Sequence, residues 1–181
     1  NKVGRNLRVL WCSTGGSSGF DPLLSVSSNT RGGRQIMLWD PRNMDKPILE
    51  KPVDSGAGQL LPMYDEGLRT VYMTGKGDTI LRAYEFITLP PLNPADLDAP
   101  SDSPAPLILL EKGLEFMTSP QEPIAGICML PKRTCDVKNV EVSKFLKLST
   151  NTVTPISFTV PRADHLKTYF HDDVFPPTRS K

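Results

Sequence analysis

The turn Gly75-Lys76-Gly77-Asp78 places a cation and a carboxylate among flexible glycines within four residues. Because glycine tolerates the positive φ angles of a tight reversal, the pattern predicts a turn with Lys76 at its solvent-facing tip. There its ammonium group can meet an acidic surface. The carboxylate of Asp78 can either accept hydrogen bonds from the backbone and hold the turn, or contact a partner directly. These residues indicate binding through charge.

A second group of cations occupies the basic loop at 131–139. Lys132, Arg133 and Lys138 lie in it, and two further lysines follow, at 144 and 147. This cluster has two interpretations. It is either an ordinary charged rim that keeps the protein solvated, or a basic strip that meets an acidic protein or anionic lipid headgroups. Rim charges of this kind mainly change association rates and their dependence on salt.

The residue types needed for catalysis are present but not arranged for it. His165 and His171 lie in a polar C-terminal stretch, with no serine or cysteine nucleophile in a strand–turn setting nearby. The pair Asp172-Asp173 lacks the spacing of a metal site and is typical of solvated charge. We therefore expect a protein with no catalytic residue, no metal site and no cofactor.

Composition favours one soluble domain made of many short strands. The chain has 181 residues, of which 38% are hydrophobic and 23% charged, and its 18 prolines and 13 glycines fall between the apolar runs. A net charge of +1 provides no global attraction to nucleic acid or membranes. We accordingly expect no nucleic-acid partner and at most a peripheral membrane contact.

The three cysteines are an odd number without CxxC spacing, which favours a reducing, cytoplasmic setting. Cys12 and Cys128 lie in apolar stretches, so we expect both to be core thiols. Cys135 follows two cations and is either a reactive thiol or a plain loop cysteine.

The apolar pattern predicts a series of short strands around a central three-stranded meander at 60–86. A helix or a strand fits 140–148 by period, and we expect a strand at 144–148. The stretch 107–117 is expected as two pieces around Gly113. The remaining expected strands are 7–12, 23–28, 35–40, 47–53, 123–130 and 155–160.

One strand carries a signature of its class. The stretch 35–40 ends in Trp39-Asp40, the strand-end pair of a WD repeat, which forms one four-stranded blade of a propeller. We expect Trp11 and Trp39 in the blade cores. In WD repeats an aspartate in the turn between the second and third strands holds that turn, which favours the structural interpretation of Asp78 over direct contact. Arg31 and Arg34 flank a glycine pair in a loop, where they either contact a partner or are simply solvated.

Taken together, these segments resemble coronin, the family of actin-binding WD-repeat proteins, over the later part of its seven-bladed propeller. The resemblance covers nearly the whole chain apart from a proline- and aspartate-rich insertion at 89–106. The strings that carry it are QIMLWD with PRNMDKP, QLLPMYDEGLRTVYMTGKGDTILRAYEF, MLPKRTCDVKNVEVSKFLKL, and PISFTVPRADHL with DDVFPPT.

The resemblance implies an all-β WD-repeat propeller. It places blade five at 7–53, blade six at 60–117 with the insertion, and blade seven at 124–160, followed by a polar C-terminal extension at 161–181 without regular structure. Three blades leave two open sheet faces, and such exposed apolar faces promote aggregation. We therefore expect these blades to lie beside the remaining blades of the same propeller, or to self-associate.

The resemblance also implies a non-catalytic scaffold in the cytoplasm that binds filamentous actin and organises the actin cytoskeleton in cell motility. The candidate contact residues are Lys76, Asp78, Lys132, Arg133 and Lys138. The first-blade basic residues that dominate filament contact in the family have no counterpart here, and neither does the family's coiled coil, which could make a homo-oligomer. The alternative is a general WD-repeat adaptor for other proteins, not acting on actin.

Overall fold

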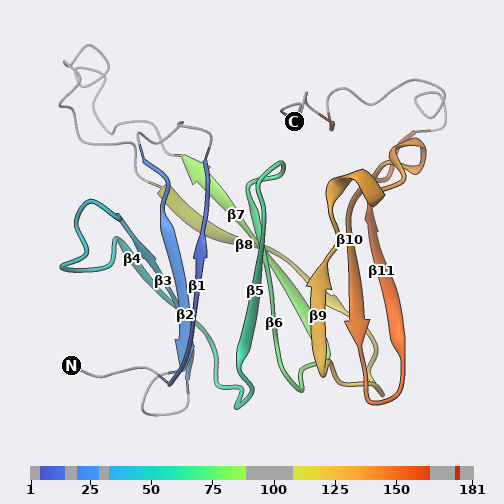
Figure 1. The fold of residues 1–181 in the computed structure, drawn as a ribbon, viewed down its shortest axis with the longest axis horizontal. Coiled ribbons are helices and arrows are strands. Elements are labelled where there is room, and N and C mark those ends of the chain that lie inside the picture. The colour runs from blue at the N-terminus through green and yellow to red at the C-terminus, as the bar shows by residue number, and fades with distance from the viewer. Residues whose placement is uncertain (1–4, 15–19, 29–32, 89–107, 164–173, 176–181) are drawn as a thin grey trace.

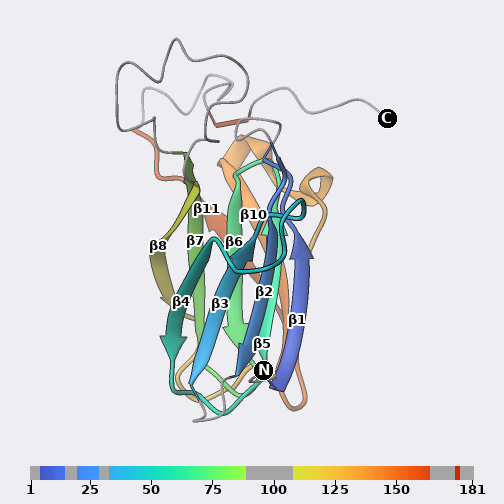
Figure 2. The ribbon, with the colours of Figure 1, turned by 90° about the vertical axis from the view of Figure 1, so that its left-hand side faces the viewer.

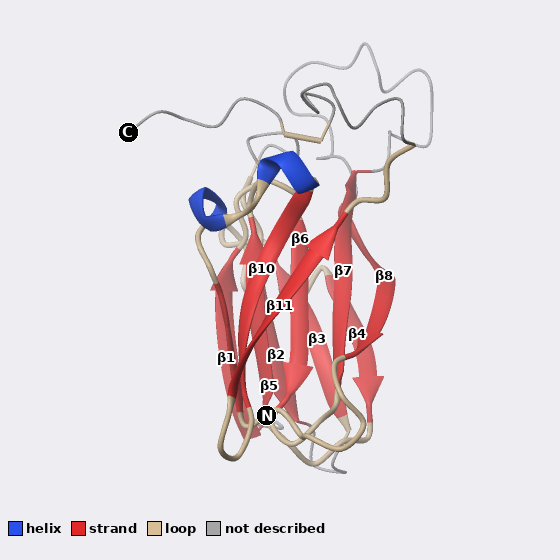
Figure 3. Ribbon diagram, turned by 90° about the vertical axis from the view of Figure 1, so that its right-hand side faces the viewer, coloured by secondary structure: helices blue, strands red, loops and turns tan. Residues whose placement is uncertain are grey.

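Three antiparallel β-sheets stand side by side like the vanes of a fan (Figure 1). The computed structural model describes residues 5–14, 20–28, 33–88, 108–163 and 174–175. Almost all regular structure in these ranges is strand, and two short 3₁₀ helices lie at one end of the strands (Figure 3). The all-β class predicted from the sequence is therefore confirmed.

The first sheet has the strand order β1-β2-β3-β4, which Figure 2 shows from its outer side. The residues of β3 alternate between a buried face and a less buried one, whereas the four central residues of β2 are buried on both faces. Leu24, Val26, Ile36 and Leu38 make up the buried face and pack against the second sheet. The four strands are β1 (Arg5–Trp11), β2 (Leu23–Ser28), β3 (Arg34–Trp39) and β4 (Leu49–Asp54).

The second sheet contains the predicted meander and one further strand, in the order β5-β6-β7-β8. The stretch expected as two pieces around Gly113 is instead one strand, β8. Its register shifts so that Ala83 pairs with Leu114 and Tyr84 with Lys112, leaving Gly113 as a bulge. The four strands are β5 (Leu60–Asp65), β6 (Thr70–Gly75), β7 (Ile80–Thr88) and β8 (Ile108–Met117).

The third sheet has the order β11-β10-β9, and no described strand pairs with the outer edge of β11. Its strands are β9 (Gly126–Met129), β10 (Glu141–Leu148) and β11 (Val153–Thr159). The ambiguous stretch 140–148 is thus a strand, and it begins three residues before the predicted start. The helices η2 (Lys132–Thr134) and η3 (Val137–Asn139) connect β9 to β10.

Aromatic side chains join the second and third sheets. Tyr72 of β6 packs edge-on against Phe145 of β10, with ring centroids 4.8 Å apart. Phe158 of β11 packs against Phe116 of β8 at 4.3 Å and against Phe145 at 5.5 Å. Edge-to-face pairs of this kind add to the burial of apolar area. Both sheet–sheet interfaces therefore contain an apolar core.

Two residues expected in the core lie on outer faces instead. The side chain of Trp11 is 58% exposed, beside exposed Leu7 and Val9 on the same face of β1, because no described sheet covers that face. Cys128 is exposed on the outer face of the third sheet for the same reason. Cys12 is buried, as predicted, and burial raises the pKa of its thiol to about 12.

The second predicted core tryptophan is only half-buried. Trp39 donates from Nε1 to Ser25 Oγ at 2.8 Å. The insertion at 89–106, Arg31, the two histidines and Asp172-Asp173 lie outside the described residues, as does most of the C-terminal extension.

Candidate functional site

The five candidate contact residues separate into two groups at opposite ends of the strands. Leu60 pairs with Gly75 at one end of the β5–β6 ladder, and Asp65 pairs with Thr70 at the other. A six-residue strand is about 20 Å long. The end that carries the loops 55–59 and 75–79 is called the Lys76 rim here. The end that carries 66–69 and 131–140 is called the Lys132 rim (Figure 1).

The turn of the Lys76 rim is held by backbone hydrogen bonds on two sides. The Lys76 N–H donates to Gln59 O at 2.8 Å, and the Gly77 N–H donates to Ile124 O at 2.8 Å. Gly77 has a φ of +92°, which explains why glycine is required at that position. The Lys76 side chain is exposed and forms no ion pair with any residue the structure describes. A free cation therefore stands on a fixed backbone.

Asp78 has the contacts of the structural interpretation. Its Oδ2 accepts from the Gly75 N–H at 3.1 Å across the turn and from Arg34 Nη2 at 2.6 Å. The carboxylate is 21% exposed. Whether Asp78 also contacts a partner stays a prediction.

Arg34, expected at the surface, is instead 98% buried, because its guanidinium is enclosed by acids of two sheets. Its Nε and Nη2 form a bidentate pair with Asp54 at 2.5 and 2.6 Å, and its Nη1 donates to Gly58 O at 3.1 Å. Burial opposes the charged guanidinium, but hydrogen bonds to Asp54 and Asp78 outweigh it and raise the pKa of Arg34.

Arg82 of β7 extends this network along the second sheet. Its Nη2 lies 2.9 Å from Asp54 Oδ2, and its Nε donates to Glu115 at 2.9 Å. The hydrogen bond from Arg34, acting with the charge of Arg82, lowers the pKa of Asp54. Sequence reasoning missed this cluster, because Asp54 and Asp78 lie 20 and 44 residues from Arg34 and meet it only once the sheets pack.

The Lys132 rim is organised around a buried acid. Asp65 at the end of β5 is 1% exposed, and it accepts from Ser143 Oγ at 2.8 Å and from the Leu68 N–H at 3.2 Å. The ammonium group of Lys132 contacts this carboxylate and also donates to the carbonyl oxygen of Val142. Lys132 is therefore engaged within the fold, unlike Lys76.

The remaining cations of this cluster differ in their exposure and in whether they have a partner within the fold. Arg133 and Lys138 are exposed, as predicted for a charged rim. Lys144 pairs with buried Glu141 at 2.8 Å, and burial of that carboxyl is outweighed by hydrogen bonds that lower its pKa. Lys147 was expected beside the cluster, but it is only 2% exposed and donates to Glu122 O at 2.6 Å. The basic strip therefore consists chiefly of Arg133 and Lys138.

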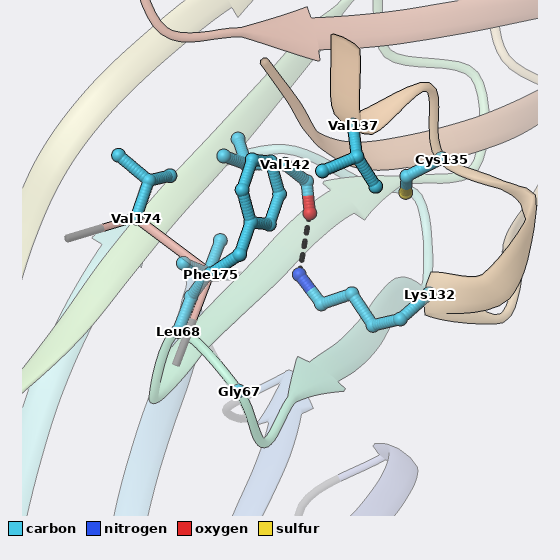
Figure 4. A pocket seen from close by; sticks show the side chains of 8 residues that line it. All are labelled: Gly67, Leu68, Lys132, Cys135, Val137, Val142, Val174 and Phe175. Atoms are coloured by element: carbon cyan, nitrogen blue, oxygen red, sulfur yellow. Dashed lines mark hydrogen bonds between the residues drawn. The ribbon is translucent and has the colours of Figure 1, made fainter. Parts of the chain in front are cut away.

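A small cavity of about 90 Å³ lies beneath this rim, lined mainly by apolar side chains (Figure 4). Leu68 from the second sheet and Val142 from the third line it, together with Phe175 from the C-terminal extension. Cys135 also lines it, and burial raises the pKa of its thiol despite the nearby charge of Lys132. The plain loop interpretation of Cys135 is thus favoured over the reactive one.

Within the part of the chain that the structure describes, no group of three or more His, Cys, Asp or Glu side chains could hold a metal ion. The same part has no helix of the length and apolar character needed to cross a bilayer.

Comparison with known proteins identifies the family. A sequence profile described as a type of WD40 repeat matches residues 153–181. Coronin-A from Dictyostelium discoideum is 33% identical over 158 residues, which is 87% of this chain. The chain is a coronin homologue. The predicted resemblance to coronin is confirmed, and the chain spans 31% of the length of Coronin-A.

The fold agrees with this assignment. The crystal structure of the WD40 domain of Toxoplasma gondii coronin superposes with a TM-score of 0.71, at 24% identity, over 94% of this chain and 38% of that one. The three sheets are therefore sheets of a coronin-type WD40 propeller. Coronin homology fits a non-catalytic protein.

Proposed function

We propose that these three sheets are blades five to seven of a coronin propeller that binds filamentous actin as a non-catalytic scaffold in the cytoplasm. The homology to Coronin-A over 87% of the chain carries the proposal. Its role is to organise actin filaments, and through them cell motility. The binding energy would come from many weak contacts on a stiff surface and not from one pocket.

The Lys76 rim is the better candidate for the filament contact. Lys76 is exposed and without an ion-pair partner among the described residues, while backbone hydrogen bonds on both sides hold its turn. A charge on a fixed backbone loses little conformational entropy on binding. Asp78 supports the contact by holding the turn, so Lys76 is the residue we assign to the filament.

The opposite rim offers fewer free charges. The ammonium group of Lys132 is engaged with Asp65, which leaves Arg133 and Lys138 as the available cations there. A rigid propeller cannot place both rims on one flat surface. Lys132, Arg133 and Lys138 therefore form the alternative contact, used only if the propeller binds the filament the other way round.

The exposed apolar face of the first sheet supports the expectation that another blade of the same propeller packs against it. Leu7, Val9 and Trp11 are 59%, 50% and 58% exposed in one row along β1. We assign this face to the preceding blade of the same propeller, and the unpaired edge of β11 to a further strand that completes the last blade. Homo-oligomers would then form through a coiled coil outside residues 1–181.

Actin co-sedimentation of the full-length polypeptide that contains these residues tests the proposal. We expect Lys76→Glu to reduce the fraction pelleted with filaments, because it reverses a free charge on the contact rim. Lys138→Glu is the matched control, with the same change on the opposite rim, and should pellet like the parent. The reverse result would assign the contact to the Lys132 rim. If neither substitution changed pelleting, the adaptor alternative would be favoured.

A second arm of the assay compares the full-length polypeptide with residues 1–181 alone. We expect the isolated segment to pellet weakly or not at all, because the family's first-blade basic residues are missing from it. Pelleting at full strength would contradict this expectation.

A further inference from the structure

The turn that carries Lys76 belongs to the second sheet, but the side chain that holds it comes from the first. Arg34 is the first residue of β3, and its Nη2 reaches Asp78 Oδ2 at 2.6 Å. The same nitrogen lies 2.6 Å from Asp54 Oδ2, at the end of β4. One guanidinium thus joins an acid of the first sheet to the Asp78 turn.

The space around this guanidinium is shaped for it. A Cβ atom on Gly56 or on Gly75 would overlap the Arg34 guanidinium, so a side chain at either position would displace it. Gly58 O accepts a third hydrogen bond, from Nη1 at 3.1 Å. Two chain segments outside β3, the loop 55–59 and the turn that begins at Gly75, therefore leave room for or bind the same side chain. Lysine cannot reproduce this planar, multi-point arrangement.

We propose that Arg34 is a positioning residue for Lys76, acting through Asp78 across the boundary between the sheets. Asp78 binds both Arg34 and the Gly75 N–H, so it transmits the position of the first sheet to the backbone directly before Lys76. Loss of the guanidinium fork would release Asp78 and loosen the turn, while the Lys76 side chain would keep its charge. This inference rests on the proposed function of Lys76, but its structural part can be measured without actin.

The structural part predicts local amide exchange. The Lys76 and Gly77 N–H groups are both hydrogen-bonded, so their exchange with deuterium reports opening of the turn. In the full-length polypeptide, Arg34→Lys should speed exchange at these two amides by about tenfold or more, with little change at the 66–69 turn on the opposite rim. Arg42→Lys is the control, since Arg42 follows β3 of the same sheet and its exposed side chain pairs with Asp40 instead. It should leave both turns unchanged.

Asp78→Asn provides a second variant, which keeps the shape of the side chain and removes its charge. It should reproduce the faster exchange at Lys76 and Gly77 even if Arg34→Lys folds poorly. The proposal is overturned if exchange at the turn stays at the parent rate in a folded variant, or if exchange rises equally at both rims, as expected for a general loss of stability.

Filament binding completes the test through a double-mutant cycle. Arg34→Lys should weaken co-sedimentation several-fold on its own and have no further effect in a Lys76→Ala background, because its effect passes through Lys76. Additive losses would overturn the positioning role. If Lys76→Ala alone leaves binding unchanged, the proposed function of Lys76 fails, and the exchange measurements still decide whether Arg34 holds the turn.

Discussion

The carboxylate of Asp65, at the end of β5, accepts a 2.8 Å hydrogen bond from Ser143 Oγ on β10. Ser143 is itself within 3.2 Å of the Tyr72 hydroxyl, so a buried polar chain crosses from the second sheet to the third. Asp65 and Ser143 are each 1% exposed. Since a buried polar group without a partner is costly, these contacts specify how the two sheets align.

Replacing Asp65 with alanine should therefore destabilise the fold. The change leaves Ser143 Oγ and the Leu68 N–H without their acceptor and removes the partner of Lys132. We expect the free energy of unfolding to fall by about 2–4 kcal/mol. Urea denaturation measures it. Glu66→Ala, the exposed neighbouring acid, is the control and should cost less than about 0.5 kcal/mol. Equal effects of the two substitutions would refute the role assigned to Asp65.

Stability in acid should depend on Asp54. Its hydrogen bond from Arg34 lowers the pKa of this carboxyl below the ordinary value of 3.8, so the folded state holds the charged form more firmly than the unfolded chain does. The resulting stabilisation is complete above about pH 4 and is lost as pH falls through the folded pKa. Asp54→Asn removes it.

Urea midpoints measured between pH 7 and pH 2 test this directly. The difference in urea midpoint between the parent and Asp54→Asn should be constant near neutral pH and should become smaller below about pH 4. Asp45→Asn, which alters an exposed carboxylate in the loop between β3 and β4, is the control, and its urea midpoints should match those of the parent. A midpoint difference that became larger in acid would contradict the stabilising role of the charged Asp54 carboxylate.

The strands were predictable because strand formation is local. Alternation of apolar residues and the glycine turns sufficed for the meander at 60–86, which the structure reproduces as β5, β6 and β7. Burial was less predictable. Alternation shows that a strand has two faces but not which of them is covered, and for this reason Trp11 and Cys128 were assigned to a core they do not enter.

The arrangement of the candidate site was beyond local sequence reasoning. Lys76 and Lys138 look alike in the sequence, and only strand pairing shows that they stand at opposite ends of the sheets. Arg34 follows two glycines and resembles a solvated loop residue. Its acidic partners lie 20 and 44 residues away, in Asp54 and Asp78, and no periodic pattern connects them.

The exposed row on β1 should govern self-association of residues 1–181. Because apolar side chains on an uncovered face associate with one another, we expect the isolated segment to form dimers or larger species. Val9→Ser with Trp11→Ser should raise the monomer fraction in analytical ultracentrifugation with little change in unfolding free energy, since both side chains are about half exposed already. Leu114→Ser, at an exposed site on β8, is the control. Unchanged association of the double variant would show that another face is responsible.

Two glycines of the Lys76 rim should differ in their tolerance of alanine. A Cβ on Gly58 would overlap the carbonyl oxygen of Lys76, a backbone atom that cannot rotate away. Gly77 has open space around the same position and only its φ of +92° opposes a side chain. We expect Gly58→Ala to cost about 2–4 kcal/mol and Gly77→Ala about 1–2 kcal/mol.

Amide exchange in the same two variants also tests whether the Lys76 rim can change without the Lys132 rim. Gly58→Ala must displace Lys76 and weaken the hydrogen bond from its N–H to Gln59 O, so the Lys76 amide should exchange faster. Gly77→Ala strains the backbone of the turn itself, so it should mainly weaken the hydrogen bond from the Gly77 N–H to Ile124 O and speed exchange at the residue 77 amide. Neither change should affect the amides at 66–69, about 20 Å away along the strands. An effect of Gly58→Ala on the distant rim equal to that on Lys76 would mean that the sheet yields as a whole, and the Lys76 turn would then not be an independently held element.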